Sequence, residues 1–121
     1  MKYMLLIYHA ENEWNSRSEK QRQEMYGEYR KLTQEIQESG KYISSSQLAA
    51  VTTATSVRVR DGKQLTTDGP FTETKEQLGG YYLIEANNLD EAIAVAARIP
   101  SARVGTIEVR PLAESAAPAN A

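Results

Sequence analysis

A run of six apolar residues near the start of the chain, Tyr3–Tyr8, limits the possible folds more than any other feature of the sequence. Its length suits a β-strand and is far too short for a helix that crosses a membrane. Because successive side chains of a strand point to opposite sides of its sheet, a strand that is apolar throughout needs cover on both faces. The run therefore predicts a strand that is buried on both faces of its sheet.

The rest of the chain predicts two helices and several more strands. Met25, Tyr29, Leu32 and Ile36 recur at the spacing of one helix face. Alternating apolar and polar residues are typical of strands. The expected segments, by residue number, are strands at 56–60, 64–67, 81–86 and 106–110, helices at 19–39 and from a cap at 88 to Pro100, and an irregular extended segment at 41–50.

Local signals mark the ends of the first helix. Ser16 and Ser18 are alternative N-caps, because each is followed three residues later by Glu19 or Gln21, which completes a capping box. Gly40 lies where a helix commonly ends in a left-handed residue.

Residues 56–67 predict a β-hairpin. Asp61-Gly62 is a strong hairpin-turn signal. Val57 and Val59 alternate with two arginines, a pattern that indicates a half-buried strand.

Without that hairpin, the order of elements is the split βαβ arrangement of ferredoxin-like α+β folds. The expected fold is βαβ(β-hairpin)βαβ, an antiparallel sheet with two helices on one face. The other sheet face would then be a large exposed apolar patch, which marks an interaction site. Since two-fold dimers are the commonest closed assemblies, we expect a homodimer whose sheets pack face to face around a central space.

Length and composition restrict the functional classes. A chain of 121 residues favours one domain, expected at residues 1–112 and followed by a flexible tail at 113–121. A net charge of −2 argues against a nucleic-acid surface. With no cysteine and one histidine, the chain offers no cysteine-based or multi-histidine metal site, and we expect no cofactor. No signal peptide or membrane segment is evident, so we expect a cytoplasmic protein.

The stretch Asp68–Tyr82 concentrates special-purpose residues, including two adjacent glycines, a Gly-Pro dipeptide and the only Phe. Gly69 can adopt backbone angles closed to other residues, and Pro70 fixes its own φ. Asp68 is therefore expected at a chain reversal. Its carboxylate could act as a general base or bind a ligand, or it could simply accept bonds from backbone N–H groups of the turn.

This stretch also resembles the signature of the DGPF proteins, a branch of the YCII-related family. The residues that carry the likeness are Asp68-Gly69-Pro70-Phe71, Glu73, Lys75-Glu76 and Gly79-Gly80, with further similarity at 1–8, 55–60 and 108–111. The resemblance implies ferredoxin-like domains that pair into dimeric α/β barrels. Some relatives are labelled transcription initiation proteins, because they are often encoded beside extracytoplasmic-function sigma factors.

The first functional hypothesis is a small-molecule site in a dimer cleft, with cofactor-free acid–base catalysis by Asp68 as its stronger form. The candidate catalytic residues are Asp68 and His9, and the candidate ligand contacts are Gly69, Pro70, Phe71, Glu73, Lys75 and Tyr82. Some other YCII-related proteins are thought to use a His–Asp pair. The likeness does not align His9 with that histidine, so a His9–Asp68 pair is a hypothesis, and a partly exposed loop histidine is the alternative.

The second hypothesis is a non-catalytic regulatory or interaction protein, linked through the resemblance to sigma-factor-dependent transcription initiation. In that case Glu73 and Lys75 would belong to a solvated loop whose ion pairs contribute little. Tyr81 and Tyr82 point to opposite sheet faces, so one of them is expected to line the space between two sheets. The first hypothesis predicts a pocket of a few hundred cubic ångströms, and the second predicts a filled interior.

Overall fold

The computed structural model describes residues 1–113 of the chain. Apart from residue 113, the expected tail lies outside the described residues. The elements, in chain order, are β1 (Lys2–His9), α1 (Glu11–Asn15), α2 (Glu19–Glu38), β2 (Tyr42–Gln47), the 3₁₀ helix η1 (Val51–Thr53), β3 (Thr55–Arg60), β4 (Lys63–Asp68), β5 (Gln77–Glu85), α3 (Leu89–Ala96), the 3₁₀ helix η2 (Pro100–Arg103) and β6 (Thr106–Pro111).

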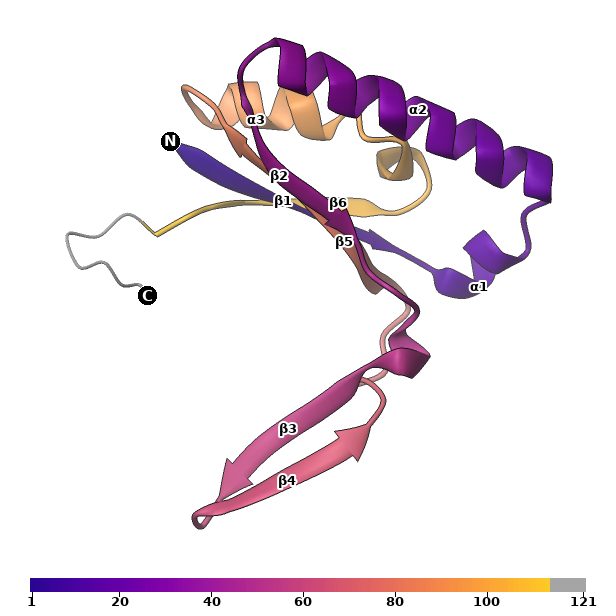
Figure 1. Ribbon diagram of the computed structural model, residues 1–121, viewed down its shortest axis with the longest axis vertical. Coiled ribbons are helices and arrows are strands. Elements are labelled where there is room, and N and C mark those ends of the chain that lie inside the picture. Colours follow the sequence, from indigo (N-terminus) through magenta and orange to yellow (C-terminus); the bar gives the residue numbers. More distant parts are fainter. Residues whose placement is uncertain (114–121) are drawn as a thin grey trace.

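Four strands form one antiparallel sheet in the order β2-β5-β1-β6. The strand β1 lies between β5 and β6, with Leu5 opposite Tyr82 on one side and Val109 on the other. Both long helices, α2 and α3, lie on one face of this sheet (Figure 1). This is the expected ferredoxin-like α+β arrangement. The segment at 41–50 contributes an edge strand, β2, whose pairing with β5 is irregular between Tyr42 and Ser44.

The hydrophobic core fills the space between the sheet and the helices. Leu5 of β1 and Ile84 of β5 are fully buried, and Leu32 and Ile36 of α2 pack against them in one cluster. The α2 face expected from periodicity is therefore confirmed. The helix α3 packs on the sheet through small residues such as Ala92, since alanines let a helix lie close to a sheet. Its larger Leu89 and Ile93 are half-exposed.

The helix α2 begins after Ser18, the second of its two candidate N-caps. Ser18 accepts a hydrogen bond from the backbone N–H of Gln21 at 3.1 Å, and the Gln21 side chain accepts from the Ser18 N–H at 2.9 Å. Ser16 is occupied elsewhere, because its hydroxyl donates to the Glu13 carbonyl at 2.7 Å at the end of α1. The expectations did not include α1. Gly40 has the expected left-handed φ of +77°.

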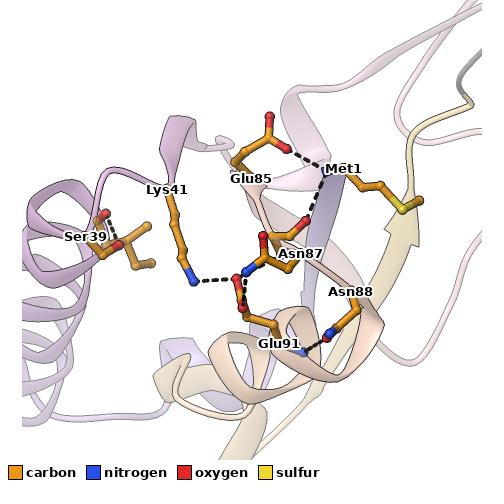
Figure 2. A network of polar contacts seen from close by, with 9 residues as sticks. Met1, Ser39, Lys41, Glu85, Asn87, Asn88 and Glu91 are labelled. Atoms are coloured by element: carbon orange, nitrogen blue, oxygen red, sulfur yellow. Dashed lines mark hydrogen bonds and ion pairs between the residues drawn. The ribbon is translucent and has the colours of Figure 1, made fainter.

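A polar network ties the start of α3 to the strands beside it (Figure 2). The carboxylate of Glu91 accepts hydrogen bonds from Lys41 and from the Asn87 side chain, the latter at 3.1 Å. The Glu91 N–H in turn donates to the Asn88 side chain at 2.9 Å, so Asn88 is the expected N-cap.

The sheet face opposite the helices, here called the open face, is apolar along its centre. Met4 and Leu6 of β1 lie opposite Leu83 and Tyr81 of β5, and all four side chains are partly exposed. No helix of residues 1–113 lies over this face (Figure 1). The strand β1 thus has the apolar character expected on both sides, and its own chain covers only one of them.

The strands β3 and β4 form a separate two-stranded sheet, which projects from the body on the side away from α2 and α3 (Figure 1). Asp61 and Gly62 both have positive φ, 52° and 74°, as a type I′ hairpin turn requires. The expectation of a half-buried strand is wrong for a single chain. Val57 and Val59 expose 59% and 61% of their surfaces, because the hairpin does not lie on the core.

Candidate functional site

A cavity of about 400 Å³ opens at the end of the sheet where β1 ends. It is bounded by α1, the first half of α2, the end of β2, the start of β5 and η2. Its aromatic lining residues are Trp14, Tyr26, Tyr29, Tyr81 and Tyr82. Polar groups from His9, Glu11 and Ser101 join them. We call this space the His9 cavity.

Trp14 reaches the cavity because α1 turns the chain back after β1. Its ring lies edge-on to the Tyr26 ring, with centroids 5.5 Å apart and planes at 72°. The His9 ring also lies edge-on to the Trp14 ring, with centroids 6.3 Å apart and planes at 64°. Aromatic pairs favour such edge-to-face geometry, so the three rings form one wall of the cavity.

The position of the His9 ring depends on Gly79. A Cβ atom at residue 79 would lie 2.4 Å from Nε2 and 2.8 Å from Cδ2 of His9. Gly80 has a different neighbour, since a Cβ there would lie 2.8 Å from the Ser46 carbonyl oxygen of β2. Both glycines lie within β5 rather than before it. Gly79 leaves room for the His9 imidazole, and Gly80 leaves room for the backbone of β2 at Ser46.

The hydroxyls of Tyr82, which is buried, and Tyr29, which is half-buried, are held by hydroxyl partners on other elements. The Tyr29 and Ser101 hydroxyl oxygens are 2.7 Å apart, and those of Tyr82 and Thr33 are 2.6 Å apart. Desolvation by burial raises the pKa of both tyrosines. Both phenols therefore stay neutral at physiological pH. Tyr82, a predicted ligand contact, lines the cavity from the helix side of the sheet.

The carboxylates at the cavity come from α1. Oε2 of Glu11 accepts a hydrogen bond from the Val51 N–H at 3.0 Å, and the Glu11 N–H donates to Oε1 of Gln77 at 2.9 Å. Glu13 is ion-paired with Arg17 at 2.9 Å. No lysine or arginine is among the described residues that line the cavity. Since Arg17 offsets the charge of Glu13, the negative charge of the lining comes chiefly from Glu11.

The loop that follows the hairpin lies apart from this lining. The predicted site residues that do not line the cavity are Asp68, Gly69, Pro70, Phe71, Glu73 and Lys75. Apart from Gly69, all of them are exposed. In the part of the chain that the structure describes, no ion pair or hydrogen bond joins His9 to Asp68. One chain thus brings His9 and Tyr82 to the same cavity without the Asp68 loop, and the roles of these residues stay predictions.

Asp68 is the last residue of β4, opposite Thr55, rather than a residue inside the turn. Within residues 1–113, no backbone N–H donates to its carboxylate. The chain reversal is instead held by Gly69, whose φ is +94° and whose N–H donates to the Ala54 carbonyl at 2.7 Å. The Ser56 hydroxyl also donates to the Gly69 carbonyl at 2.9 Å. The alternative in which Asp68 caps the turn therefore has no support here.

Several cavity residues were not predicted from the sequence. Tyr29 was assigned to the core, and Ser101 and Glu11 were not singled out. Trp14 lines the cavity, and its ring contacts Tyr26 of α2. The one usable signal was the cluster of Trp14 and two tyrosines around the start of the first helix.

The sheet order and the two helices on one face of the sheet define an α+β protein of the ferredoxin-like type. The model of the YCII-related domain matches residues 1–116, and the chain belongs to this family. It is also 36% identical over 115 residues to the Uncharacterized protein R00369 of Rhizobium meliloti (strain 1021), covering 93% of each chain.

Two further findings concern the described residues alone. None of their helices has the length and apolar content needed to cross a membrane. No group of three or more His, Asp or Glu side chains among them could hold a metal ion.

Proposed function

We propose that the protein binds a small organic molecule in the His9 cavity. The observation that carries this proposal is a cavity of about 400 Å³ with an aromatic wall and a few convergent polar groups. Small-molecule sites typically have volumes of about 300–1,000 Å³ and this kind of lining. The two hydroxyl pairs and the packing of the Trp14 ring against Tyr26 favour a preformed site.

The charges around the cavity restrict its ligand. Glu11 and Glu13 line it, and no lysine or arginine does so within the described chain. Recognition of a phosphate or a carboxylate usually relies on arginine or lysine. Aromatic faces beside carboxylates instead suit a neutral aromatic molecule or an organic cation. We therefore expect arylalkylamines to bind better than the matching arylalkyl acids.

In the catalytic form of this proposal, His9 and Asp68 act as acid and base without a cofactor. His9 is suited to proton transfer near neutral pH. The Asp68 loop lies outside the cavity lining in one chain. The carboxylate therefore needs a loop movement or a second copy of the chain to reach a ligand. A homodimer that packs through its open faces is part of the proposal, as is a cytoplasmic location.

A fluorescence titration tests the ligand site directly, because Trp14 is the only tryptophan. We expect tyramine to change Trp14 emission saturably and 4-hydroxyphenylacetate to do so more weakly. A thermal-shift screen provides the second readout, since a ligand selective for the folded state raises Tm. If neither probe nor any member of a small aromatic library gives saturable binding, the proposal is wrong.

A regulatory protein linked to sigma-factor-dependent transcription is the second candidate. The exposed Phe71, with 76% of its surface accessible, favours it because such a side chain suits a protein contact. Direct DNA binding is not expected from a net charge of −2. A filled cavity and a ligand-independent Tm would favour this candidate over the first.

A further inference from the structure

The β3–β4 hairpin, residues 55–68, is here called the arm. Every residue of it except Ser56 is exposed. Directly opposed residues of an antiparallel pair share a face, so Val57 and Val59 lie on one face with Thr66 and Gln64. We call this side the valine face. Leu65, which exposes 48% of its surface, lies on the other side opposite Arg58.

An arm of this kind has little to stabilise it within its own chain. The bonds near its base, between Gly69 and Ala54 and between Ser56 and Gly69, order only the first residues. A two-stranded hairpin alone is marginally stable in water. The valines, which favour strands because they pack well there, have no such packing in the single chain. The valine face can therefore be buried only by a surface that lies outside its own chain.

We propose that the arm packs through its valine face against the body of a second copy of this chain, in a two-fold dimer. The arm projects on the same side of the body as the open face (Figure 1). That face has an apolar centre at Met4, Leu6 and Leu83 and carries Glu108 and Arg110 at its β6 edge. In a two-fold assembly one arm contact is made twice, and both apolar surfaces of each chain are covered.

The areas of the open face and of the arm support a second copy of the chain as the binding partner. Four strands of about six residues give a sheet face of roughly 400 Å², whereas a stable interface buries about 800 Å² on each partner. The open face alone is small by that measure. The arm adds roughly 200 Å², which brings the area to about 600 Å² on each partner and closer to that of a stable interface. With strands about 20 Å long, the arm can cross the width of a four-stranded sheet.

Charge also favours an arm against the partner's body rather than against the partner's arm. The arm carries Arg58, Arg60 and Lys63 against Asp61 and Asp68, a net charge of +1, and Asp68 lies at its base, away from the turn. Since the whole chain has a net charge of −2, the remainder carries −3. Opposite signs steer the two surfaces together, and like charges keep two arm tips apart.

The test compares the dimer dissociation constants of the wild type, V57T/V59T and Leu65→Thr by analytical ultracentrifugation. The double variant keeps side-chain shape and strand preference but places hydroxyls on the valine face, and we expect it to weaken the dimer on the order of 100-fold. Leu65→Thr makes a similar change on the opposite face and should leave the dissociation constant within about threefold.

Hydrogen exchange in the wild type gives an independent readout. Backbone amides of the arm should be protected at concentrations above the dissociation constant and exchange freely below it. A wild type that sediments only as a 13.5 kDa species overturns both the open-face dimer and the arm contact. A stable dimer with an unprotected arm and an unchanged V57T/V59T constant overturns the arm contact alone. Neither outcome tests the ligand proposal, which is tested by the Trp14 fluorescence titration.

Discussion

At the scale of single residues, the site depends on a glycine facing a histidine. Gly79 leaves the space that the imidazole of His9 occupies, and the ring then contacts Trp14. This pair lies on neighbouring strands, since His9 is opposite Gln77 in the β1–β5 register. The double glycine of the sequence is thus explained by two separate close approaches.

We predict that Gly79→Ala destabilises the protein through His9. The added Cβ would displace the ring, which should cost about 1–3 kcal/mol of unfolding free energy, as for other overpacked sites. The measurement is urea unfolding of Gly79→Ala in the wild type and in a His9→Ala background. In the second background the penalty should largely vanish. An equal penalty in both backgrounds would show that the imidazole is not what the methyl group meets.

Asp68→Asn should leave stability nearly unchanged, within about 0.5 kcal/mol, because the carboxylate is exposed and accepts no backbone hydrogen bond in the described chain. Urea unfolding checks this, with Ser56→Ala as the comparison. That change removes the hydroxyl bond to Gly69 at the same turn and should cost about 0.5–1.5 kcal/mol. A larger loss for Asp68→Asn would restore a structural role for its carboxylate. If stability is kept but tyramine binding is lost, the functional role gains support.

At the scale of elements, polar contacts fix the positions of the helices on the sheet. Glu91 joins the start of α3 to Lys41 before β2 (Figure 2). Arg103 of η2 holds Glu28 of α2 with two hydrogen bonds of 2.8 and 2.9 Å. The hydrogen bond from Lys41, followed by that from the Asn87 backbone, lowers the pKa of Glu91, and Arg103 lowers the pKa of Glu28.

These depressed pKa values predict an acid-dependent loss of stability. A carboxyl whose pKa is lower in the folded state stabilises the fold above its unfolded pKa of about 4.3, and the contribution is lost as pH falls through the folded pKa. Glu91→Gln should therefore be less stable than the wild type at pH 7 and should converge with it towards pH 3. Urea unfolding across this range is the measurement, and Glu38→Gln, at an exposed position of α2, is the control. Parallel pH profiles for the wild type and Glu91→Gln would contradict the prediction.

At the scale of the whole molecule, one chain buries one face of its sheet and leaves two apolar surfaces uncovered. The first is the open face around Leu6, and the second is the valine face of the arm. Contiguous exposed apolar surface is characteristic of interaction sites. The single chain thus contains the core and the cavity, whereas the open face and the valine face are suited to contact with another molecule.

The sequence by itself determined the main strands, the two longer helices and their order, but not α1 or the two 3₁₀ helices. The apolar run in β1, the α2 periodicity, the Asn88 cap and the Asp61-Gly62 turn all rest on interactions within a few residues. Such local preferences are readable without coordinates. Together with the topology rules for a split βαβ unit, they were enough to predict the ferredoxin-like sheet.

Only the tertiary structure decided where the chemistry gathers. Tyr29 and Ser101 are 72 residues apart in the chain, yet their hydroxyls share a hydrogen bond at the cavity. The Asp68 loop, the most distinctive stretch of the sequence, follows the base of the arm and lies outside that cavity. Contacts between distant residues depend on strand register and on the packing of whole elements, and no local pattern contains that information.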